Sequence, residues 1–349
     1  MAQNGRDEFY KGETAKILAK HLQVKGGIIT EEDLANYEAI WREPIVFPYR
    51  DLKIISMAPP SSGGITLAQI LKMLEPYDLQ KLGHHSPEYI QLLVEAERRA
   101  YADRNFYLGD PDFVQIPVDK LFDSDYLKSR METFNWEKAT KSEDIAAGKI
   151  EFAESMETTH YSIVDAAGNA VSVTTTLNGA YGSKLYVDEL GFFMNNEMDD
   201  FSAKPGTPNM FGLIGAEANS IAPGKRMLSS MTPTIVEKNG KLFMVVGTPG
   251  GSTIITSVLQ TILNVAEFDM GMQEAVESPR FHHQWLPDLV NFEPKAFDST
   301  LIQTLKSRGY LINEANSPII GKVDAILVLP DGKLEGGADP RGDDMAVGF

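Results

Sequence analysis

The chain has 349 residues, of which 43% are hydrophobic, and a formal net charge of −17 at pH 7. This length is enough to bury a core in one large domain or about two smaller ones. The negative charge argues against a nucleic-acid partner, which needs a basic surface. No apolar run approaches the roughly 18 residues of a membrane helix, so no membrane span is expected. Cysteine is absent, which excludes a catalytic thiol and disulfides.

Two helices are expected in the first forty residues. No helix or strand signal precedes Phe9, and no signal peptide is recognisable there. Helical periodicity covers 13–22 and stops at two glycines. Thr30 and Asp33 stand at the spacing of a capping box, which predicts a short helix that ends at Tyr37.

Strands, a tight loop and a long helix are expected next. Residues 45–57 carry β-branched and aromatic side chains around a turn, which predicts strands. The run Pro-Pro-Ser-Ser-Gly-Gly at 59–64 predicts a tight loop before a helix. Ser86 followed by Pro87 predicts the start of a long helix that ends near Arg104.

The second half of the chain differs in pattern. Residues 137–157 are polar and weakly periodic, which predicts a linker between domains. Alternation over 160–165 and 170–177 predicts a hairpin, and Asn-Gly at 239–240 predicts another. A helix is expected over 252–268. Strand pairs mixed with helices, without a regular βαβ rhythm, predict an α+β sandwich.

Common catalytic and cofactor motifs do not occur in the sequence. There is no G-x-S-x-G elbow, no H-E-x-x-H and no Walker lysine. Two histidine pairs stand at 84–85 and 282–283, but few carboxylates lie at ligand spacing around them. Structural roles are therefore favoured for these histidines, and neither a metal nor a cofactor is expected.

Thr158 stands between the polar linker and the first hairpin strand. If the bond between Glu157 and Thr158 were cut, the threonine would carry a free α-amine beside its hydroxyl. Such an amine has a pKa near 8, so its neutral form can accept the hydroxyl proton. Gly250 and Gly251 offer two backbone N–H groups just before a helix, where an oxyanion is stabilised. On these residues alone, a simple turn is the more frequent role of a glycine pair.

Two polar clusters carry complementary hydrogen-bonding groups. Ser229 and Ser230 offer donors for a carboxylate. The acidic and amide residues of 195–200 offer acceptors for an ammonium group. Taken singly, each cluster is more commonly a solvated loop.

Together these segments resemble the γ-glutamyltranspeptidase family, in collinear order over nearly the whole chain. The resemblance implies a four-layer αββα sandwich of the N-terminal-nucleophile hydrolase type, with no cofactor or metal. The segments that carry it are 7–12, 59–64, 101–104, 108–112, 158–162, 195–203, 228–234, 249–252, 279–283 and 339–341.

The resemblance implies a precursor that cleaves itself between Glu157 and Thr158. Residues 1–157 would be the C-terminal portion of the large subunit, ending in the polar linker, and 158–349 would be the small, catalytic subunit. The Thr158 hydroxyl would attack a γ-glutamyl amide such as glutathione. The γ-glutamyl-threonine ester would then pass its acyl group to water or to the amine of an amino acid or peptide.

The resemblance also implies roles for individual residues. The implied catalytic residues are Thr158, Thr176, Gly250 and Gly251. In that set, Thr176 would position the nucleophile and the two glycine amides would form the oxyanion hole. The implied substrate-binding residues are Asn178, Glu197, Asp200, Ser229 and Ser230. The first three of these would bind the α-ammonium group, and the two serines would bind the α-carboxylate.

The sequence departs from the family pattern in three places. The long N-terminal part of the large subunit is not seen, nor is its arginine that pairs with the α-carboxylate, so no arginine is assigned to that role. Glu197 stands where many bacterial relatives have glutamine. Residues 205–212 resemble the lid over the glutamyl pocket, with Phe211 in place of a tyrosine.

Two other interpretations stay open. A related enzyme would use the same threonine on poly-γ-glutamate or on a cephalosporin side chain. Alternatively, an unprocessed fragment would be a scaffold or an inactive precursor. By the same resemblance, the expected location is periplasmic or secreted.

Overall fold

The computed structural model describes residues 2–145, 159–204, 206–207, 209–210 and 212–348. Thr158 and Glu157 lie outside these ranges. The helices are α1 (Gly5–Tyr10), α2 (Glu13–Val24), α3 (Glu31–Asn36), α4 (Gly63–Leu74), α5 (Leu79–Leu82), α6 (Pro87–Tyr107), α7 (Val118–Phe122), α8 (Ser124–Met131), α9 (Thr253–Phe268), α10 (Met272–Glu277) and α11 (Ser299–Ser307). The strands are β1 (Ile45–Tyr49), β2 (Leu52–Ser56), β3 (Thr159–Val164), β4 (Ala170–Thr175), β5 (Tyr186–Val187), β6 (Phe192–Phe193), β7 (Thr234–Lys238), β8 (Lys241–Gly247), β9 (Phe281–His282), β10 (Val290–Phe292), β11 (Ile312–Asn313), β12 (Asp324–Val328) and β13 (Leu334–Ala338).

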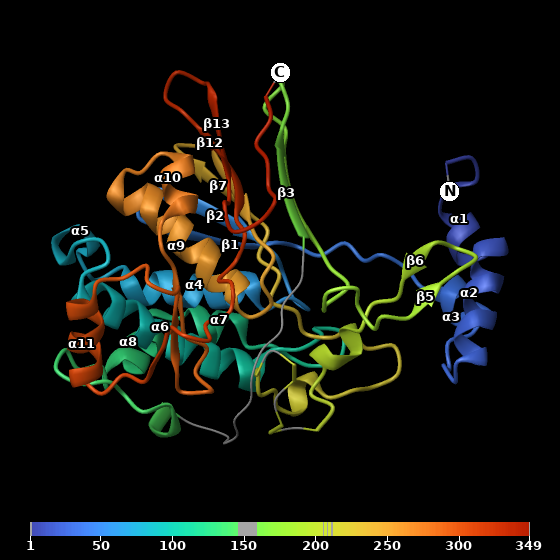
Figure 1. Ribbon diagram of the computed structural model, residues 1–349, viewed down its shortest axis with the longest axis horizontal. Coiled ribbons are helices and arrows are strands. Elements are labelled where there is room, and N and C mark those ends of the chain that lie inside the picture. Colours follow the sequence, from blue (N-terminus) through green and yellow to red (C-terminus); the bar gives the residue numbers. More distant parts are fainter. Residues whose placement is uncertain (1, 146–158, 205, 208, 211, 349) are drawn as a thin grey trace.

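A six-stranded antiparallel sheet forms the centre of the molecule, in the order β1-β2-β7-β8-β12-β13 (Figure 1). Side chains alternate across it: in β2, Leu52 and Ile54 are buried while Lys53 is exposed. Because side chains alternate with a period of two, this pattern fixes which face of the strand meets the core. A further small sheet pairs β9, β10 and β11.

Helices α4 and α9 cover one face of the central sheet, and α6 packs against α4 (Figure 1). Helix α4 contacts β1, β2, α6 and α9, and α9 contacts β8. Leu67 and Ile70 of α4 and Ile255 and Leu259 of α9 are fully buried in this layer. Burying one such side chain stabilises the fold by about 1.5–3 kcal/mol, so the helical layer provides much of the rigidity beneath the site described below.

The hairpin of β3 and β4 packs against β7, β8 and β12 and forms a second sheet layer. Several of its inward side chains are polar: the Ser162 hydroxyl donates to the Asp324 carbonyl at 3.1 Å, and the Ser172 hydroxyl donates to the Val246 carbonyl at 3.2 Å. Its outward face carries Tyr161, Ile163 and Val171, which are 45–51% exposed. Helices, central sheet and hairpin together make three layers of the α+β sandwich that the sequence predicts.

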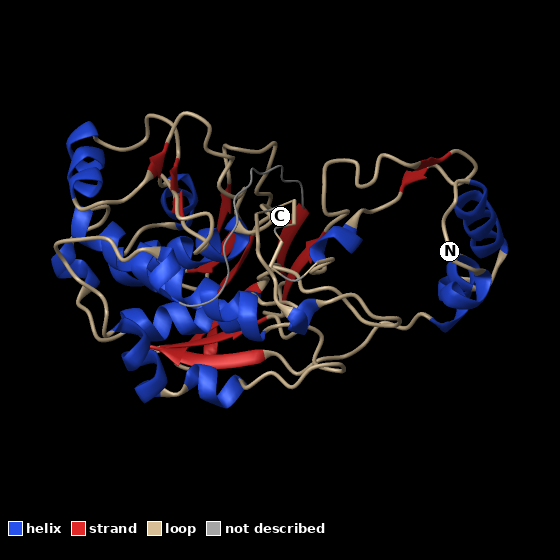
Figure 2. Ribbon diagram, turned by 90° about the horizontal axis from the view of Figure 1, so that it is seen from below, coloured by secondary structure: helices blue, strands red, loops and turns tan. Residues whose placement is uncertain are grey.

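Helices α1, α2 and α3 stand to one side of the body and pack against β5 and β6 (Figures 1 and 2). Leu18, Leu22 and Val187 are the buried residues of this small cluster. The predicted capping box is present: the Asp33 N–H donates to Thr30 Oγ1 at 3.1 Å, and the Thr30 N–H donates to Asp33 Oδ2 at 2.8 Å. Among the described helices, none has the length and apolar character to cross a bilayer.

The part of 137–157 that the structure describes is docked on the body. Ser142 is fully buried, and its N–H donates to Asp288 Oδ2 at 2.8 Å. Its hydroxyl accepts a hydrogen bond from the buried Arg98 guanidinium. A polar sequence therefore lies in a buried position here because distant charged groups satisfy its hydrogen bonds.

Candidate active site

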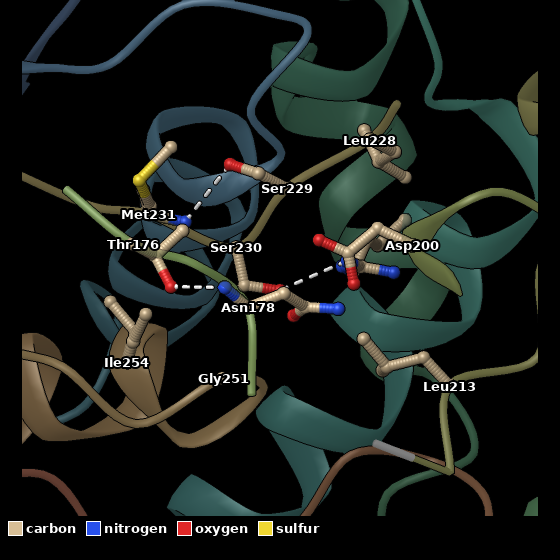
Figure 3. A pocket seen from close by; sticks show the side chains of 11 residues that line it. Thr176, Asn178, Asp200, Leu213, Leu228, Ser229, Ser230, Met231, Gly251 and Ile254 are labelled. Carbon is tan, nitrogen blue, oxygen red and sulfur yellow. Dashed lines mark hydrogen bonds between the residues drawn. The ribbon is translucent and has the colours of Figure 1, made fainter. Parts of the chain in front are cut away.

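A small cavity of about 20 Å³ gathers six of the nine predicted site residues. It opens where the end of α6, the start of α9 and the loops after β4 and before β7 meet (Figure 3). The lining residues are Arg104, Thr176, Asn178, Asp200, Leu213, Leu228, Ser229, Ser230, Met231, Gly251 and Ile254.

Ser229 and Ser230 form one side of the cavity (Figure 3). They lie just before β7, where Ser229 makes a parallel bridge with Ser61 in the loop over 59–64. Ser230 is 9% exposed, and its hydroxyl oxygen accepts a hydrogen bond from Arg104 Nη2 at 3.0 Å. A hydroxyl that accepts in this way keeps its own proton available to donate, as binding of a carboxylate requires.

Asn178 and Thr176 are joined on another side of the cavity (Figure 3). The Asn178 N–H donates to Thr176 Oγ1 at 2.7 Å. Asn178 is 3% exposed and has a φ of +74°, in the left-handed region that asparagine tolerates better than most residues. Its amide nitrogen donates to the Asn196 carbonyl at 3.3 Å. Because its nitrogen points at that carbonyl, the amide oxygen is the group that Asn178 offers as an acceptor.

Asp200 brings a carboxylate into the cavity from the 3₁₀ turn Glu197–Asp200. Burial raises the pKa of the Asp200 carboxyl to about 7, and the charges of Glu197 and Asp199 add to the rise while Arg104 opposes it. Glu197 is not a lining residue, and burial raises the pKa of its carboxyl as well. Glu197 therefore does not line the cavity, but its charge acts on the Asp200 carboxyl from the start of the same 3₁₀ turn.

Gly250 and Gly251 form the turn that leads into α9, as the sequence predicts. Gly250 has a φ of +138°, and a Cβ there would lie 2.6 Å from Thr253 Oγ1. Both facts require glycine at this position. Gly251 lines the cavity and Gly250 does not. The helix that begins immediately after them directs its positive end toward the cavity.

A second cavity, of about 400 Å³, adjoins the first through Thr176. Thr159 also lines it and pairs with Thr175 across the β3–β4 hairpin. The predicted nucleophile Thr158 lies outside the described residues. Its neighbour Thr159 is the first described residue after the gap, and it lines the second cavity, which adjoins the first.

The predicted lid over 205–212 is described in part, and Phe211 lies outside the described residues. Met210 Sδ accepts a hydrogen bond from Asn178 Nδ2 at 3.5 Å. The Met210 N–H donates to Asp199 Oδ2 at 2.7 Å. Leu213, just beyond the segment, lines the cavity. This segment therefore contacts the side of the cavity that carries Asn178.

Sequence reasoning missed Arg104, which lines the cavity from the last turn of α6. The signal was present, because the segment 101–104 belongs to the family pattern. A charged residue late in a long helix is usually solvent-exposed, however, and nothing in the sequence places it beneath Ser230.

The histidine pairs make hydrogen bonds and ring contacts within the fold. His84 Nε2 lies 3.0 Å from Asn264 Oδ1, and the ring stacks on His85. The His283 N–H donates to Glu97 Oε2 at 3.1 Å. Within the described ranges, no group of three histidine or acidic side chains is arranged to hold a metal ion.

Comparison with known sequences gives one family across the whole chain. The profile of the family described as gamma-glutamyltranspeptidase matches residues 1–349. A protein of Escherichia coli (strain K12) named glutathione hydrolase proenzyme is 49% identical over 350 residues, which cover 100% of this chain and 60% of that protein. A protein of the same name from Pseudomonas aeruginosa is 46% identical over 347 residues, or 98% of this chain and 61% of that protein. The chain thus spans about 60% of the length of these curated relatives.

Solved structures show the same fold. The cephalosporin acylase of Bacillus halodurans has a TM-score of 0.83 at 25% identity, over 97% of this chain and 59% of that one. The gamma-glutamyltranspeptidase of Pseudomonas nitroreducens has a TM-score of 0.53 at 45% identity, over 55% of this chain and 100% of the matched chain. The α+β sandwich predicted from the sequence is confirmed.

Proposed function

This chain belongs to the gamma-glutamyltranspeptidase family, and on that premise we propose that the gene product containing it cleaves γ-glutamyl amides such as glutathione. The acyl group passes to Thr158 as an ester and then to water or to the amine of an amino acid or peptide. The observation that carries the proposal is the single cavity in which Ser229, Ser230, Asn178 and Asp200 meet.

These four residues match the two charges of a free glutamyl head. Ser230 supplies a hydroxyl donor for an α-carboxylate, and Ser229, whose hydroxyl donates to Ser61 Oγ at 3.1 Å, supplies a second one when it turns to the ligand. Asn178 and Asp200 supply acceptors for an α-ammonium group. A zwitterion needs both kinds of partner, because a buried charge that lacks a partner is costly. The pairing of donors with acceptors therefore favours an α-amino acid head over an uncharged acyl group.

We assign the nucleophile to Thr158, one peptide unit or about 3.8 Å between Cα atoms from Thr159. Its hydroxyl oxygen forms the ester bond to the γ-carbonyl carbon, and its free α-amine takes the hydroxyl proton. That proton then goes to the leaving amine as the amide C–N bond breaks. Thr176 borders both cavities, which supports its assignment as the residue that orients this threonine.

The amides of Gly250 and Gly251 are assigned to the oxyanion of the tetrahedral intermediate. Their support is the turn geometry ahead of α9 and the lining position of Gly251. Backbone donors at a helix start stabilise negative charge as it develops, and one such donor typically changes kcat by about 10²–10³-fold.

We propose the division into a piece 1–157 and a piece 158–349, produced by self-cleavage of one precursor. Residues 158–349 are 192 of the 349 residues. A complete chain of the Pseudomonas nitroreducens structure matches 55% of this chain, the same share. These relatives are named proenzymes, which supports processing as well.

A competing activity comes from the acylase relatives. The cephalosporin acylase structure covers nearly the whole chain, and a protein of a Pseudomonas species named Acylase ACY 1 proenzyme is 38% identical over 348 residues. The paired carboxylate donors and ammonium acceptors favour the γ-glutamyl substrate. A panel of a γ-glutamyl anilide, poly-γ-glutamate and a cephalosporin with an acyl side chain separates the activities.

The direct test is turnover of a γ-glutamyl anilide by the gene product that contains this chain. The wild-type protein should release the aniline, and Thr158→Ala should reduce release to background. Equal turnover by the two proteins would remove Thr158 from its role. The periplasmic or secreted location stays a prediction, which cell fractionation followed by the same assay checks.

A further inference from the structure

Arg104 is a buried arginine whose hydrogen-bond partners are all neutral. It is 3% exposed. Its Nε donates to Ser62 Oγ at 2.9 Å, its Nη1 to Asn105 Oδ1 at 2.9 Å and its Nη2 to Ser230 Oγ at 3.0 Å. Burial lowers the pKa of its guanidinium to about 10.

Other buried arginines of the chain have an anionic partner. Arg98 contacts Asp288, Arg99 Nη1 lies 2.6 Å from Glu95 Oε2, and Arg280 pairs with Asp339. Among the described residues, the hydrogen bonds of Arg104 go to two hydroxyls and one amide oxygen, and none goes to a carboxylate. Asp200 acts on it only through its charge at longer range. A buried cation without a paired anion is costly, and this one faces a cavity.

The hydrogen bonds of Arg104 continue into the backbone of the carboxylate-binding segment. Ser62, which accepts from Arg104, donates its hydroxyl proton to the Ser229 carbonyl at 2.7 Å. The Ser62 N–H donates to the same carbonyl at 2.9 Å, and the Ser229 N–H donates to the Pro60 carbonyl at 3.0 Å. One guanidinium therefore controls both the side chain of Ser230 and, through Ser62, the backbone of Ser229.

The loop over 59–64 has no room for adjustment at this contact. A Cβ at Gly63 would lie 2.3 Å from the Met231 carbonyl oxygen and 2.4 Å from Thr232 Oγ1. Ser61 and Ser62 are fully buried, and the Ser61 hydroxyl donates to the Met231 carbonyl at 2.6 Å. The loop thus contacts the segment 229–231 through closely packed backbone, and Arg104 fixes the loop by its hydrogen bond to Ser62.

We propose that Arg104 is the positioning residue of the carboxylate side: it directs the Ser230 hydroxyl proton into the cavity and supplies the positive charge that a bound α-carboxylate neutralises. Because Ser230 Oγ accepts from Nη2, its own proton stays free to be donated to the ligand. The inference rests on the proposed function, since it takes the ligand to be the α-carboxylate of a glutamyl head.

The test compares two anilides that differ only in this carboxylate. The γ-glutamyl anilide carries it, and the 4-aminobutyryl anilide has a hydrogen in its place. Arg104→Gln keeps the length and a donor but removes the charge. We expect the preference in kcat/KM for the glutamyl compound to fall by about 10- to 100-fold. Turnover of the 4-aminobutyryl compound should change less than about 3-fold, because it has no carboxylate to lose.

Arg130→Gln is the matched control, because Arg130 also serves α6: its Nη2 lies 3.2 Å from Asp103 Oδ1. This variant should lower thermal stability and leave the preference unchanged. A preference that survives Arg104→Gln would overturn the proposal. If that variant does not fold, Arg104→Lys decides. It keeps the charge but loses the fork that binds Ser62 and Ser230 together, so the preference should fall by a smaller factor. An unchanged preference in this variant would overturn the positioning role.

Calorimetry with L-glutamate and with 4-aminobutyrate separates this inference from the proposed function. If the wild-type protein turns over neither anilide, the proposed function fails on its own. In that case, L-glutamate binding that is lost in Arg104→Gln still supports the role of Arg104, and absence of L-glutamate binding by the wild-type protein overturns it.

Discussion

The two sides of the cavity are built in different ways. The side that we assign to the α-carboxylate is anchored in the core, where Ser230 receives a hydrogen bond from the buried Arg104 and Ser229 bridges to a buried loop. The side that we assign to the α-ammonium group is made of loops, with Asn178 in a left-handed conformation and Asp200 in a 3₁₀ turn.

The two sides therefore differ in how their ligand-binding groups respond to pH. The donors of the first side are hydroxyls and a guanidinium, whose hydrogen bonds do not change with pH in the neutral range. The second side depends on Asp200, whose raised pKa of about 7 lies within that range. Binding of the ammonium group should therefore respond to pH, while binding of the carboxylate should not.

Among the changes around the cavity, the largest loss of kcat is expected from a substitution that alters neither of its two sides. Gly250→Ala places a Cβ 2.6 Å from Thr253 Oγ1 in a backbone conformation with φ of +138°, so the oxyanion donors should shift. We expect kcat to fall by about 10²–10³-fold with KM nearly unchanged. Gly240→Ala is the control, since it also has positive φ but open space around it; it should cost about 1 kcal/mol of stability and no activity. Equal kcat losses in both variants would argue against the assigned oxyanion hole.

Asp200→Asn should remove the carboxylate, and with it the pH dependence, from the side assigned to the α-ammonium group. We expect kcat/KM for a γ-glutamyl anilide to fall by about 100-fold, because a buried ammonium loses its anion. The same change should stabilise the ligand-free protein above pH 7. A carboxyl with a raised folded-state pKa favours folding below its unfolded value near 4, and that contribution is lost as pH rises through about 7.

Thermal melts of the wild type and Asp200→Asn at pH 5 and pH 8 check this sign. The difference in melting temperature should grow in favour of the variant at pH 8. A variant that is less stable at pH 8 than at pH 5, relative to the wild type, would be inconsistent with a raised pKa for Asp200.

Ser230→Ala should weaken the side assigned to the α-carboxylate by about 10-fold in KM, the usual cost of one hydrogen bond to a charged group. The loss should be the same at pH 6 and pH 8, because no group that titrates in this range is removed. Ser307→Ala, at an exposed position in α11, serves as the control. A loss that depends strongly on pH would mean that the two sides are coupled.

Glu197→Gln should have the smallest effect, within about 3-fold in KM, since an amide oxygen still accepts a hydrogen bond. Its informative readout is the pH profile of kcat/KM. The charge of Glu197 raises the pKa of Asp200, so the acidic limb should move to lower pH in the variant. A limb that stays in place or moves upward would exclude this electrostatic link.

Local signals made much of the fold predictable. Helix starts are marked by capping residues, Thr30 with Asp33 for α3 and Ser86 for α6. The turn between β7 and β8 is marked by Asn239 and Gly240, which both have positive φ. Such interactions are encoded within a few residues, so sequence alone identifies them.

The features that escaped prediction depend on distant segments. Helix α1 lacks a side-chain cap at Asn4, so no local start signal exists. Ser142 lies in a polar run but is buried against Asp288, far along the chain. Arg104 reaches the cavity only because α6 passes beneath residues 229–231, and tertiary contacts of this kind carry no local pattern.

In the proposed mechanism catalysis depends on release of the amine of residue 158, and intact mass spectrometry alongside an activity assay tests this step most directly. The purified gene product should convert from one polypeptide to two that are divided between Glu157 and Thr158. Turnover of γ-glutamyl anilide should rise in proportion to the cleaved fraction. Full turnover by a protein whose mass shows that bond intact would contradict the account.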